Sequence, residues 1–132
     1  MLAGSVLGFT LLTSSMALAQ DTGNSSIFCP NLTQNMKLGY CDQSIDDADC
    51  LSHVTGDQVS QLQHFLMDYF HNPAGLWLSG YFGPKTKAYV IKFQAEWDLP
   101  TTGNVFNLTR AAIREACTQT PPPPPVTPPL PT

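Results

Sequence analysis

The chain has 132 residues, of which 42% are hydrophobic and 12% charged, and its formal net charge is -4. This composition is typical of one small soluble globular domain with a low-charge surface, together with extensions. Residues 51–117 hold five acidic and five basic side chains, so the acidic excess lies earlier in the chain. Neither part has the basic stripe that a phosphate backbone requires, and nucleic acid is excluded as an expected partner.

Residues 1–19 have the pattern of a secretory signal peptide. An apolar run, Val6 to Leu12, precedes Ala17-Leu18-Ala19, a small-x-small cleavage signature just before Gln20. The usual basic n-region is missing, because Lys37 is the first basic residue, so the natural start could lie upstream. A retained membrane anchor is the less favoured alternative, since Gly, Ser and Thr interrupt the run of about 20 apolar residues that a span needs. We expect export to the cell envelope or medium, with no membrane attachment after signal removal.

Four cysteines in an exported chain favour two disulfides, although four cysteines allow three pairings. We favour Cys41 with Cys50 and Cys29 with Cys117. Closing the long loop would contribute about 4 to 5 kcal/mol in the chain-entropy picture, and closing the short loop about 2 to 3 kcal/mol. Zinc is the competing use of four cysteines, but no Cys-x-x-Cys pair occurs, so no metal is expected.

Residues 20–53 show no sustained periodicity, and we expect an irregular extension of coil and short turns. Its acidic side chains Asp42, Asp46, Asp47 and Asp49 raise the alternative of a calcium loop. The glycine and the terminal glutamate of an EF-hand are both missing, which favours a solvated acidic loop between two cysteines.

The first helix is predicted from a capping box at Thr55, with Gln58 reaching back, to about Phe70. His64, Asp68 and His71 are spaced to share the face opposite the core, where a metal is possible but a solvated polar face is the favoured interpretation. The predicted buried stripe comprises Val59, Leu62, Phe65, Leu66 and Tyr69.

A second helix is predicted to begin at Gly83 or Pro84, because proline suits the first helical position. The loop before it contains Trp77, which fits either a core cap or an exposed platform for a sugar ring or peptide. The expected apolar face of this helix comprises Thr86, Tyr89, Val90, Phe93 and Trp97.

A third helix is predicted from Asn107, a good N-cap, to about Cys117. Its bundle-facing residues would be Leu108, Ala112, Ile113 and Ala116. Beyond it, eight of the last twelve residues are proline, which is typical of an extended spacer of about 3 Å per residue. Such a spacer indicates a fragment or short relative of a longer protein.

Several of these motifs occur in the order of a known family. Gly-x-Phe-Gly-x-x-Thr-x-x-x-Val-x-x-Phe-Gln at residues 80–94 follows Val59-x-x-Leu62-Gln63 and precedes Leu99-Pro100-x-x-Gly103 and Thr109. The segment 55–117 resembles the peptidoglycan-binding domain family of three-helix cell-wall modules. It departs from the family pattern at Asp98, where glycine is usual and where we expect a somewhat strained helix end, and at Tyr89, where a small residue is usual.

The expected fold class is all-α: a small three-helix bundle with an irregular disulfide-bearing N-terminal extension and a proline-rich C-terminal tail. The expected segments are a signal peptide at 1–19, the extension at 20–53, the three-helix domain at 54–117 and the tail at 118–132.

The resemblance implies a secreted, non-catalytic module that binds peptidoglycan, both glycan and stem peptide, as a monomer and without a cofactor. Cell-wall polymers present sugar faces, amides and carboxylates, which suit a cleft of aromatic and polar side chains with some positive charge. Phe82 and Thr86 also fit buried support, and Lys85 also fits a solvated charge. The expected ligand contacts are Trp77, Tyr81, Phe82, Lys85, Thr86 and Gln94.

Two other functions remain open. The same bundle could be a protein-interaction or assembly module of the bacterial surface that has lost glycan affinity, marked by an exposed apolar patch. It could also be the targeting fragment of a larger wall hydrolase. Catalysis by this chain is not expected, because no Ser/His/Asp or Cys/His set, paired glutamates or His-Glu-x-x-His motif occurs. Metalloprotease propeptides share a similar bundle, but their Pro-Arg-Cys-Gly switch motif is missing around Cys117.

Overall fold

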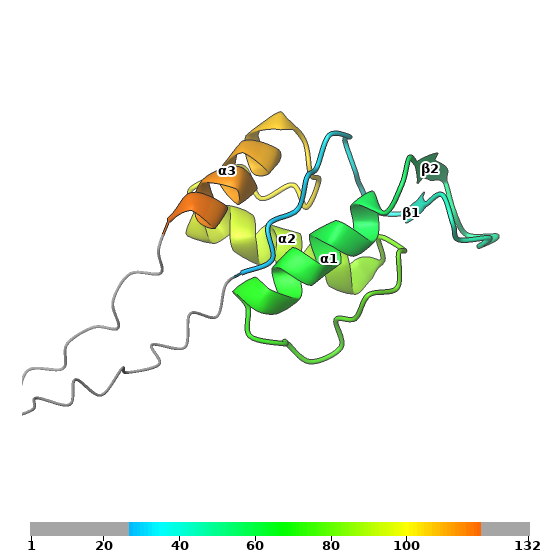
Figure 1. Ribbon diagram of the computed structural model, residues 1–132, viewed down its shortest axis with the longest axis horizontal. Helices are drawn as coiled ribbons and strands as arrows, with labels where there is room; N and C mark the ends of the chain where they lie inside the picture. The colour runs from blue at the N-terminus through cyan, green and yellow to red at the C-terminus, as the bar shows by residue number, and fades with distance from the viewer. Residues whose placement is uncertain (1–26, 120–132) are drawn as a thin grey trace, which may run out of the picture.

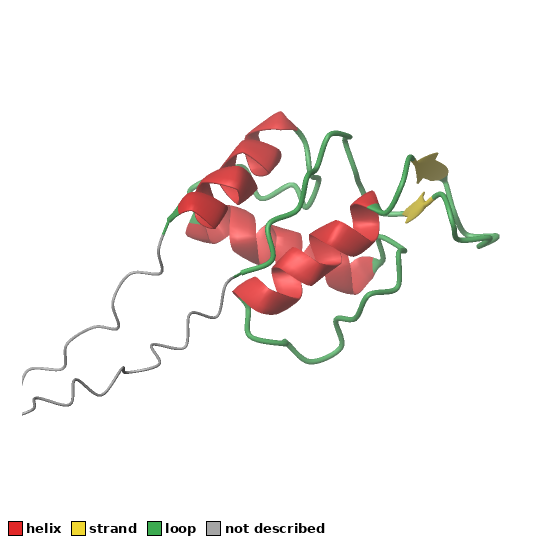
Figure 2. Ribbon diagram, in the orientation of Figure 1, coloured by secondary structure: helices red, strands yellow, loops and turns green. Residues whose placement is uncertain are grey.

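The computed structural model describes residues 27–119. The elements are β1 (Tyr40–Asp42), β2 (Ser52–Val54), α1 (Gln58–Tyr69), α2 (Pro84–Glu96) and α3 (Asn107–Thr118). The three predicted helices are confirmed and form the body, while the two short strands lie at one end (Figures 1 and 2). Within residues 27–119 no helix is long and apolar enough to cross a membrane. The predicted signal peptide and the proline run after Gln119 lie outside the described residues.

The prediction of an all-α fold is wrong in one respect, because β1 and β2 form a two-stranded parallel sheet in the N-terminal extension. The other edge of β1 bonds to the turn before α2. Phe82 N–H donates to the Tyr40 carbonyl at 2.8 Å, and Asp42 N–H donates to the Gly80 carbonyl at 2.9 Å. Buried backbone groups need partners, and Cys41 and Asp42 are 0% and 1% exposed. Burial of the extension therefore forces a ladder where the sequence shows no strand periodicity.

The predicted capping box at the start of α1 does not form. The helix begins at Gln58, and Asp57 occupies the N-cap position without a side-chain cap bond. The hydroxyl of Thr55 instead accepts a hydrogen bond from Gln34, and Gln58 Oε1 accepts the Thr33 N–H at 2.8 Å. The extension packs against this helix end and supplies partners that compete with the local motif.

Helix α1 is capped by a distant carboxylate. Asp42, at the end of β1, accepts the Val59 N–H at 2.6 Å and the Ser60 N–H at 2.9 Å, as well as the Ser60 hydroxyl at 2.6 Å. These amides belong to the first helical turn, which has no intrahelical partners for its N–H groups and carries partial positive charge. The cap therefore links the sheet to the helix through a buried, charge-assisted contact.

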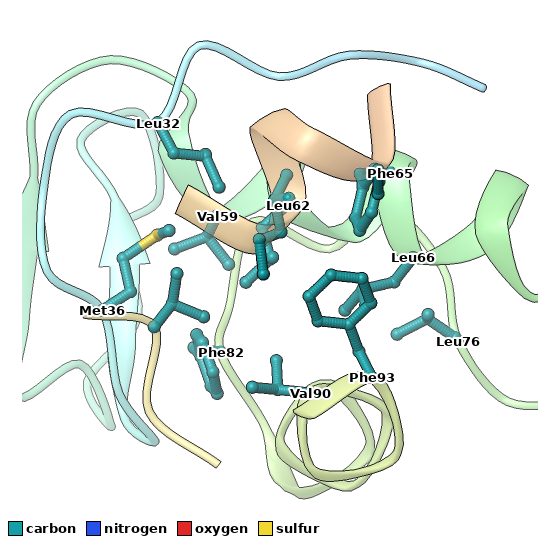
Figure 3. Packing of buried hydrophobic residues seen from close by; sticks show 14 of the residues in the cluster. Leu32, Met36, Val59, Leu62, Phe65, Leu66, Leu76, Phe82, Val90 and Phe93 are labelled. Carbon is teal, nitrogen blue, oxygen red and sulfur yellow. The ribbon is translucent and has the colours of Figure 1, made fainter. Parts of the chain in front are cut away.

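The core lies between the three helices and is closed by the extension (Figure 3). Leu32 and Met36 of the extension point into it beside Val59 and Phe82 (Figure 3). The prediction that Leu108 faces the bundle is wrong, because its side chain is 64% exposed at the first turn of α3, over a surface cleft. The predicted core residues that are buried comprise Val59, Leu62, Phe65, Leu66, Val90, Phe93, Ala112, Ile113 and Ala116.

The helix face expected to be a solvated polar stripe is partly covered. The Phe28 ring stacks on His64 with centroids 4.1 Å apart, and the Phe28 N–H donates to Asp68 at 2.9 Å. His71 lies beyond the end of α1 with a φ of 57°, so it does not continue the stripe. The first described residues of the extension therefore pack on this face, which periodicity within the helix could not indicate.

Two disulfides fix the extension, and they are the two pairs favoured from the sequence. Cys29–Cys117 joins the start of the described chain to the end of α3, across 88 residues. Cys41–Cys50 closes the loop between β1 and β2, across 9 residues. The long connection restricts the unfolded chain more strongly, which in the chain-entropy picture makes it the larger contribution, about 4 to 5 kcal/mol.

Asp42 offers a direct test of the distant helix cap. Asp42→Ala leaves buried donors of α1 unpaired, so we expect it to lower the free energy of unfolding by about 2 to 4 kcal/mol. Urea unfolding of the oxidised protein measures this. The matched control is Asp46→Ala, an exposed acid in the loop that follows β1, which should change stability by less than about 0.5 kcal/mol. Equal midpoints for the two variants would contradict the cap.

The ends of α1 and α2 meet at Tyr69, whose hydroxyl donates to Glu96 at 3.0 Å and accepts the Trp97 indole N–H at 3.2 Å. Burial is the largest cause that raises the pKa of Tyr69 above 10.0; the Trp97 hydrogen bond lowers it, and Glu96 raises it further. The pKa of Tyr69 is higher in the folded state than in the unfolded state. The stability that neutral Tyr69 contributes is therefore complete below about pH 10 and is lost as pH rises through the folded-state pKa.

Tyr69→Phe should therefore cost about 1 kcal/mol at pH 7, and the deficit relative to wild type should shrink above about pH 10. Urea unfolding midpoints of wild type and Tyr69→Phe, compared at pH 7 and above about pH 10, measure this deficit. A deficit that stays constant or grows with pH would show that the tyrosine is not held neutral by its surroundings.

Candidate functional site

A buried glutamine organises the turn between α1 and α2. Gln63, 1% exposed, makes five hydrogen bonds to this turn. Its Oε1 accepts the N–H groups of Ser79 and Gly80 at 2.9 and 3.0 Å. Its Nε2 donates to the Tyr81 carbonyl at 2.9 Å and to the Thr86 and Ser79 hydroxyls at 3.0 and 2.9 Å. One α1 side chain thus fixes both the turn and the first residues of α2.

The turn itself requires glycine at position 80. Gly80 has a φ of +69°, and a Cβ atom there would lie 2.2 Å from Cδ1 of Ile45. Both the backbone conformation and the close approach of the extension exclude a larger residue. The ring of Tyr81 lies beside the backbone of Gly83, where an added Cβ would be 3.2 Å from ring carbons. The turn therefore sets the position of the Tyr81 ring at the surface.

A surface cleft of about 390 Å³ lies beside this turn. Around it Trp77 is 63% exposed, Lys85 is exposed and Tyr81 is half-buried. The Lys85 side chain runs along the backbone of Gly75, where an added Cβ would lie 3.2 Å from its Cε. We name this the first cleft; its lining residues are Ile45, Asp47, Gln63, Gly75, Leu76, Trp77, Ser79, Tyr81, Gly83, Pro84, Lys85 and Thr86.

Four of the six residues predicted as ligand contacts line the first cleft: Trp77, Tyr81, Lys85 and Thr86. The sequence leaves open whether Trp77 caps the core or forms an exposed platform, and in the structure its side chain is exposed. Thr86 is 2% exposed and accepts the Gln63 hydrogen bond, so it supports the cleft from below. Phe82 is 0% exposed and packs in the core, which rules out direct ligand contact by its side chain in this structure.

The sixth predicted contact, Gln94, lies at a different cleft and repeats the role of Gln63. Its Oε1 accepts the Gly103 N–H at 2.8 Å, and its Nε2 donates to the Asn104 carbonyl at 2.9 Å and to the Thr109 hydroxyl at 3.0 Å. This second cleft, of about 370 Å³, lies at the start of α3. It is lined by Asn35, Gln94, Leu99, Pro100, Thr102, Asn104, Phe106, Asn107, Leu108 and Thr109.

Sequence reasoning missed the part played by Gln63 and the contribution of Ile45 and Asp47 from the extension. The signal for Gln63 is present, because Val59-x-x-Leu62-Gln63 has the same spacing as Val90-x-x-Phe93-Gln94. No local pattern indicates that the loop after β1 reaches the first cleft. That placement depends on the pairing of β1 with the turn before α2.

The chemistry of the first cleft suits binding of a partly apolar, partly anionic molecule. Trp77 and Tyr81 supply aromatic surface, and Lys85 supplies positive charge. Asp47 is the acid among the described lining residues, and its carboxylate accepts the Asp49 N–H at 2.9 Å. Among residues 27–119 no group of three His, Cys, Asp or Glu side chains is placed to hold a metal ion.

Comparison with protein families assigns the central segment. Residues 55–114 match the family described as "Putative peptidoglycan binding domain". The match covers 60 of the 132 residues, and over these residues the chain is similar to that family. No curated protein and no solved structure matches the chain. The matched segment includes Gln63, Gln94 and both turns, and it leaves out the extension that pairs with them.

The two buried glutamines, Gln63 and Gln94, should be unequal in importance. We expect Gln63→Met to cost about 3 kcal/mol of unfolding free energy and Gln94→Met about 2 kcal/mol, because Gln94 satisfies fewer buried groups. Urea unfolding measures both. Gln43→Met, at an exposed position, is the matched control and should be nearly neutral. Costs near zero at position 63 would contradict its role in fixing the turn.

Proposed function

We propose that this chain is an exported, non-catalytic module that binds peptidoglycan through the first cleft. The observation that carries the proposal is the exposed indole of Trp77 beside the cationic Lys85 and the ring of Tyr81, around a cleft within the segment that matches the peptidoglycan-binding family. The two disulfides agree with an oxidising location outside the cytosol.

Peptidoglycan combines the chemistries that the first cleft can recognise. Sugar rings present apolar faces that pack on aromatic side chains, which favours contact with Trp77 and Tyr81. Stem peptides carry carboxylates, which favours Lys85 as their partner. Since Lys85 is exposed, such an ion pair contributes only about 0.2 to 1 kcal/mol and serves mainly to orient the ligand.

The buried hydrogen bonds below the cleft support recognition by a prearranged surface. Gln63 holds the Tyr81 carbonyl and the Thr86 hydroxyl, so less ordering is required when a ligand binds. A binding role without catalysis is supported by the acids at the cleft. Glycoside hydrolysis normally uses a pair of carboxylates, and Asp47 is the single acid among the described lining residues.

An assembly module of the cell surface is the second candidate. Trp77 and Leu78 are adjacent and 63% and 52% exposed, which is the kind of apolar surface that a protein partner covers. This function would place the same residues against a folded protein instead of a glycan. Binding to purified wall polymer separates the two candidates.

The deciding experiment is co-sedimentation of the oxidised protein with purified, protein-free peptidoglycan sacculi. We expect saturable binding that Trp77→Ala weakens about tenfold and Lys85→Met about two- to fivefold, as expected for one aromatic contact and one exposed ion pair.

The controls keep composition matched. Leu51→Ala removes another exposed apolar side chain, beside the sheet, and Lys92→Met removes one exposed charge from α2 outside the first cleft. Both should bind as wild type does. Absence of wild-type binding to sacculi of several stem-peptide chemistries would overturn the wall-binding proposal and leave the assembly module.

A further inference from the structure

We propose that the second cleft is a second ligand site, selective for uncharged, N-acetylated glycan. This inference rests on the proposed peptidoglycan binding and adds a division of labour between two sites. It is carried by the internal repeat of the binding domain and by the side chains in which the two halves differ.

The two clefts have the same scaffold. Gly80 and Thr86 correspond to Gly103 and Thr109, each pair being 23 residues apart in the sequence. The two glycines have φ values of +69° and +72°, and each donates its N–H to a buried glutamine. Each glutamine also donates to the carbonyl of the residue that follows its glycine, Tyr81 or Asn104, and to the hydroxyl of the corresponding threonine.

The correspondence extends to the extension and to the cleft walls. Phe82 exchanges backbone hydrogen bonds with the extension, and Val105 does the same through both its N–H and its carbonyl with Met36. Eight lining residues of the second cleft each have a counterpart 23 positions earlier that lines the first, and Gln94 lines the second as Gln63 lines the first. The cavities also have similar volumes, about 370 and 390 Å³. The second cleft is therefore built as a site in the same way as the first.

The side chains that face the ligand differ in charge. Leu108 occupies the position that corresponds to Lys85, and Asn104 the position that corresponds to Tyr81. Among the described residues that line the second cleft none is ionisable, whereas Lys85 and Asp47 line the first. A carboxylate would lose its hydration in the second cleft without gaining a cationic partner on its lining, and the Arg110 guanidinium behind that lining already donates to the Asn35 and Asn107 amide oxygens, which favours a neutral ligand.

Amide donors in the second cleft are held in a fixed orientation. The guanidinium of Arg110 donates to Oδ1 of Asn35 from the extension and to Oδ1 of Asn107 on α3. Because the oxygens are engaged, the Nδ2–H groups of both amides remain as donors, and neither bonds to another described residue. Two oriented donors suit carbonyl acceptors of the kind that acetamido groups of amino sugars carry.

The second cleft also has apolar surface for a sugar face. Phe106 and Leu108 are 44% and 64% exposed and both line it, next to Leu99 and Pro100. An exposed aromatic ring beside fixed amide donors is the combination that binds the apolar face and polar edge of a pyranose.

The two clefts are close enough to act on one polymer. Thr86 lines the first cleft and Gln94 the second, and both belong to α2. Eight residues of helix separate them, a rise of about 12 Å. Peptidoglycan offers both chemistries along a strand: a neutral N-acetylated backbone for the second cleft, and carboxylate-bearing peptides for Lys85 in the first.

The test is a titration of the oxidised, isotope-labelled full chain with a soluble oligomer of N-acetylglucosamine, followed by amide chemical shifts. We expect the largest shifts at residues 104–109, and smaller ones at residues 81–86. The matching glucose oligomer lacks acetamido groups and should bind at least about tenfold more weakly. Equal affinity for the two oligomers, or shifts confined to the first cleft, would overturn the proposal.

Variants separate the clefts without disturbing the fold. Asn107→Asp keeps the oxygen that Arg110 binds and suits a helix start, but loses the amide donor, so oligomer affinity should fall about two- to tenfold. Phe106→Ala should lower it about tenfold, and Lys92→Met, at an exposed lysine of α2 outside both clefts, should leave it unchanged. Unaltered affinity in both second-cleft variants, with folding verified by circular dichroism, would overturn the proposal.

The two proposals fail in different ways. If wild type does not sediment with sacculi, peptidoglycan binding itself is wrong. If sacculus binding is lost in Trp77→Ala but the N-acetylglucosamine oligomer causes no shifts at residues 104–109, the first cleft stands and the second does not.

Discussion

Two buried carboxamides determine most of this structure. Each turn that precedes a helix exposes backbone N–H and carbonyl groups to the core, where water is excluded and unpaired groups are costly. Gln63 and Gln94 satisfy those groups from a neighbouring helix, since a carboxamide both donates and accepts. A leucine or methionine at either position would fill the space but leave the turn unpaired. The turns, and therefore the starts of α2 and α3, depend on these two side chains.

The N-terminal extension completes what the glutamines begin. It pairs with the residue after each turn, through Met36 at Val105 and through β1 at Phe82, and it caps α1 with Asp42. The disulfide Cys29–Cys117 ties the start of this segment to the end of α3, and Cys41–Cys50 closes the loop within it, so the extension is a fixed part of the domain. A domain with three short helices gains both core surface, from Leu32 and Met36, and hydrogen-bond partners in this way.

The parts of the fold that depend on local pattern are predictable from sequence, and the parts that depend on distant pairing are not. The three helices and most of their apolar stripes follow from period and from residues such as Pro84 at a helix start. The capping box at Thr55 fails because Gln34 and Asp42, remote in sequence, offer better partners. In the candidate site the sequence pattern identifies Tyr81 and Phe82 as a pair, but it does not say which ring is buried. Pairing of this segment with β1 decides that, because successive side chains of a paired segment point to opposite sides.

The internal repeat separates structural constraint from ligand recognition. Positions that face the core or the turn are alike in the two halves: Gln63 with Gln94, Gly80 with Gly103 and Thr86 with Thr109. Positions that face solvent differ in the two halves: Trp77 with Pro100, Tyr81 with Asn104 and Lys85 with Leu108. Packing and hydrogen bonding leave the solvent-facing positions free, because they touch few buried groups. The two halves therefore share a scaffold and have cavities of similar size, and their side chains differ at the solvent-facing positions. A scaffold that carries two different ligand preferences requires this arrangement.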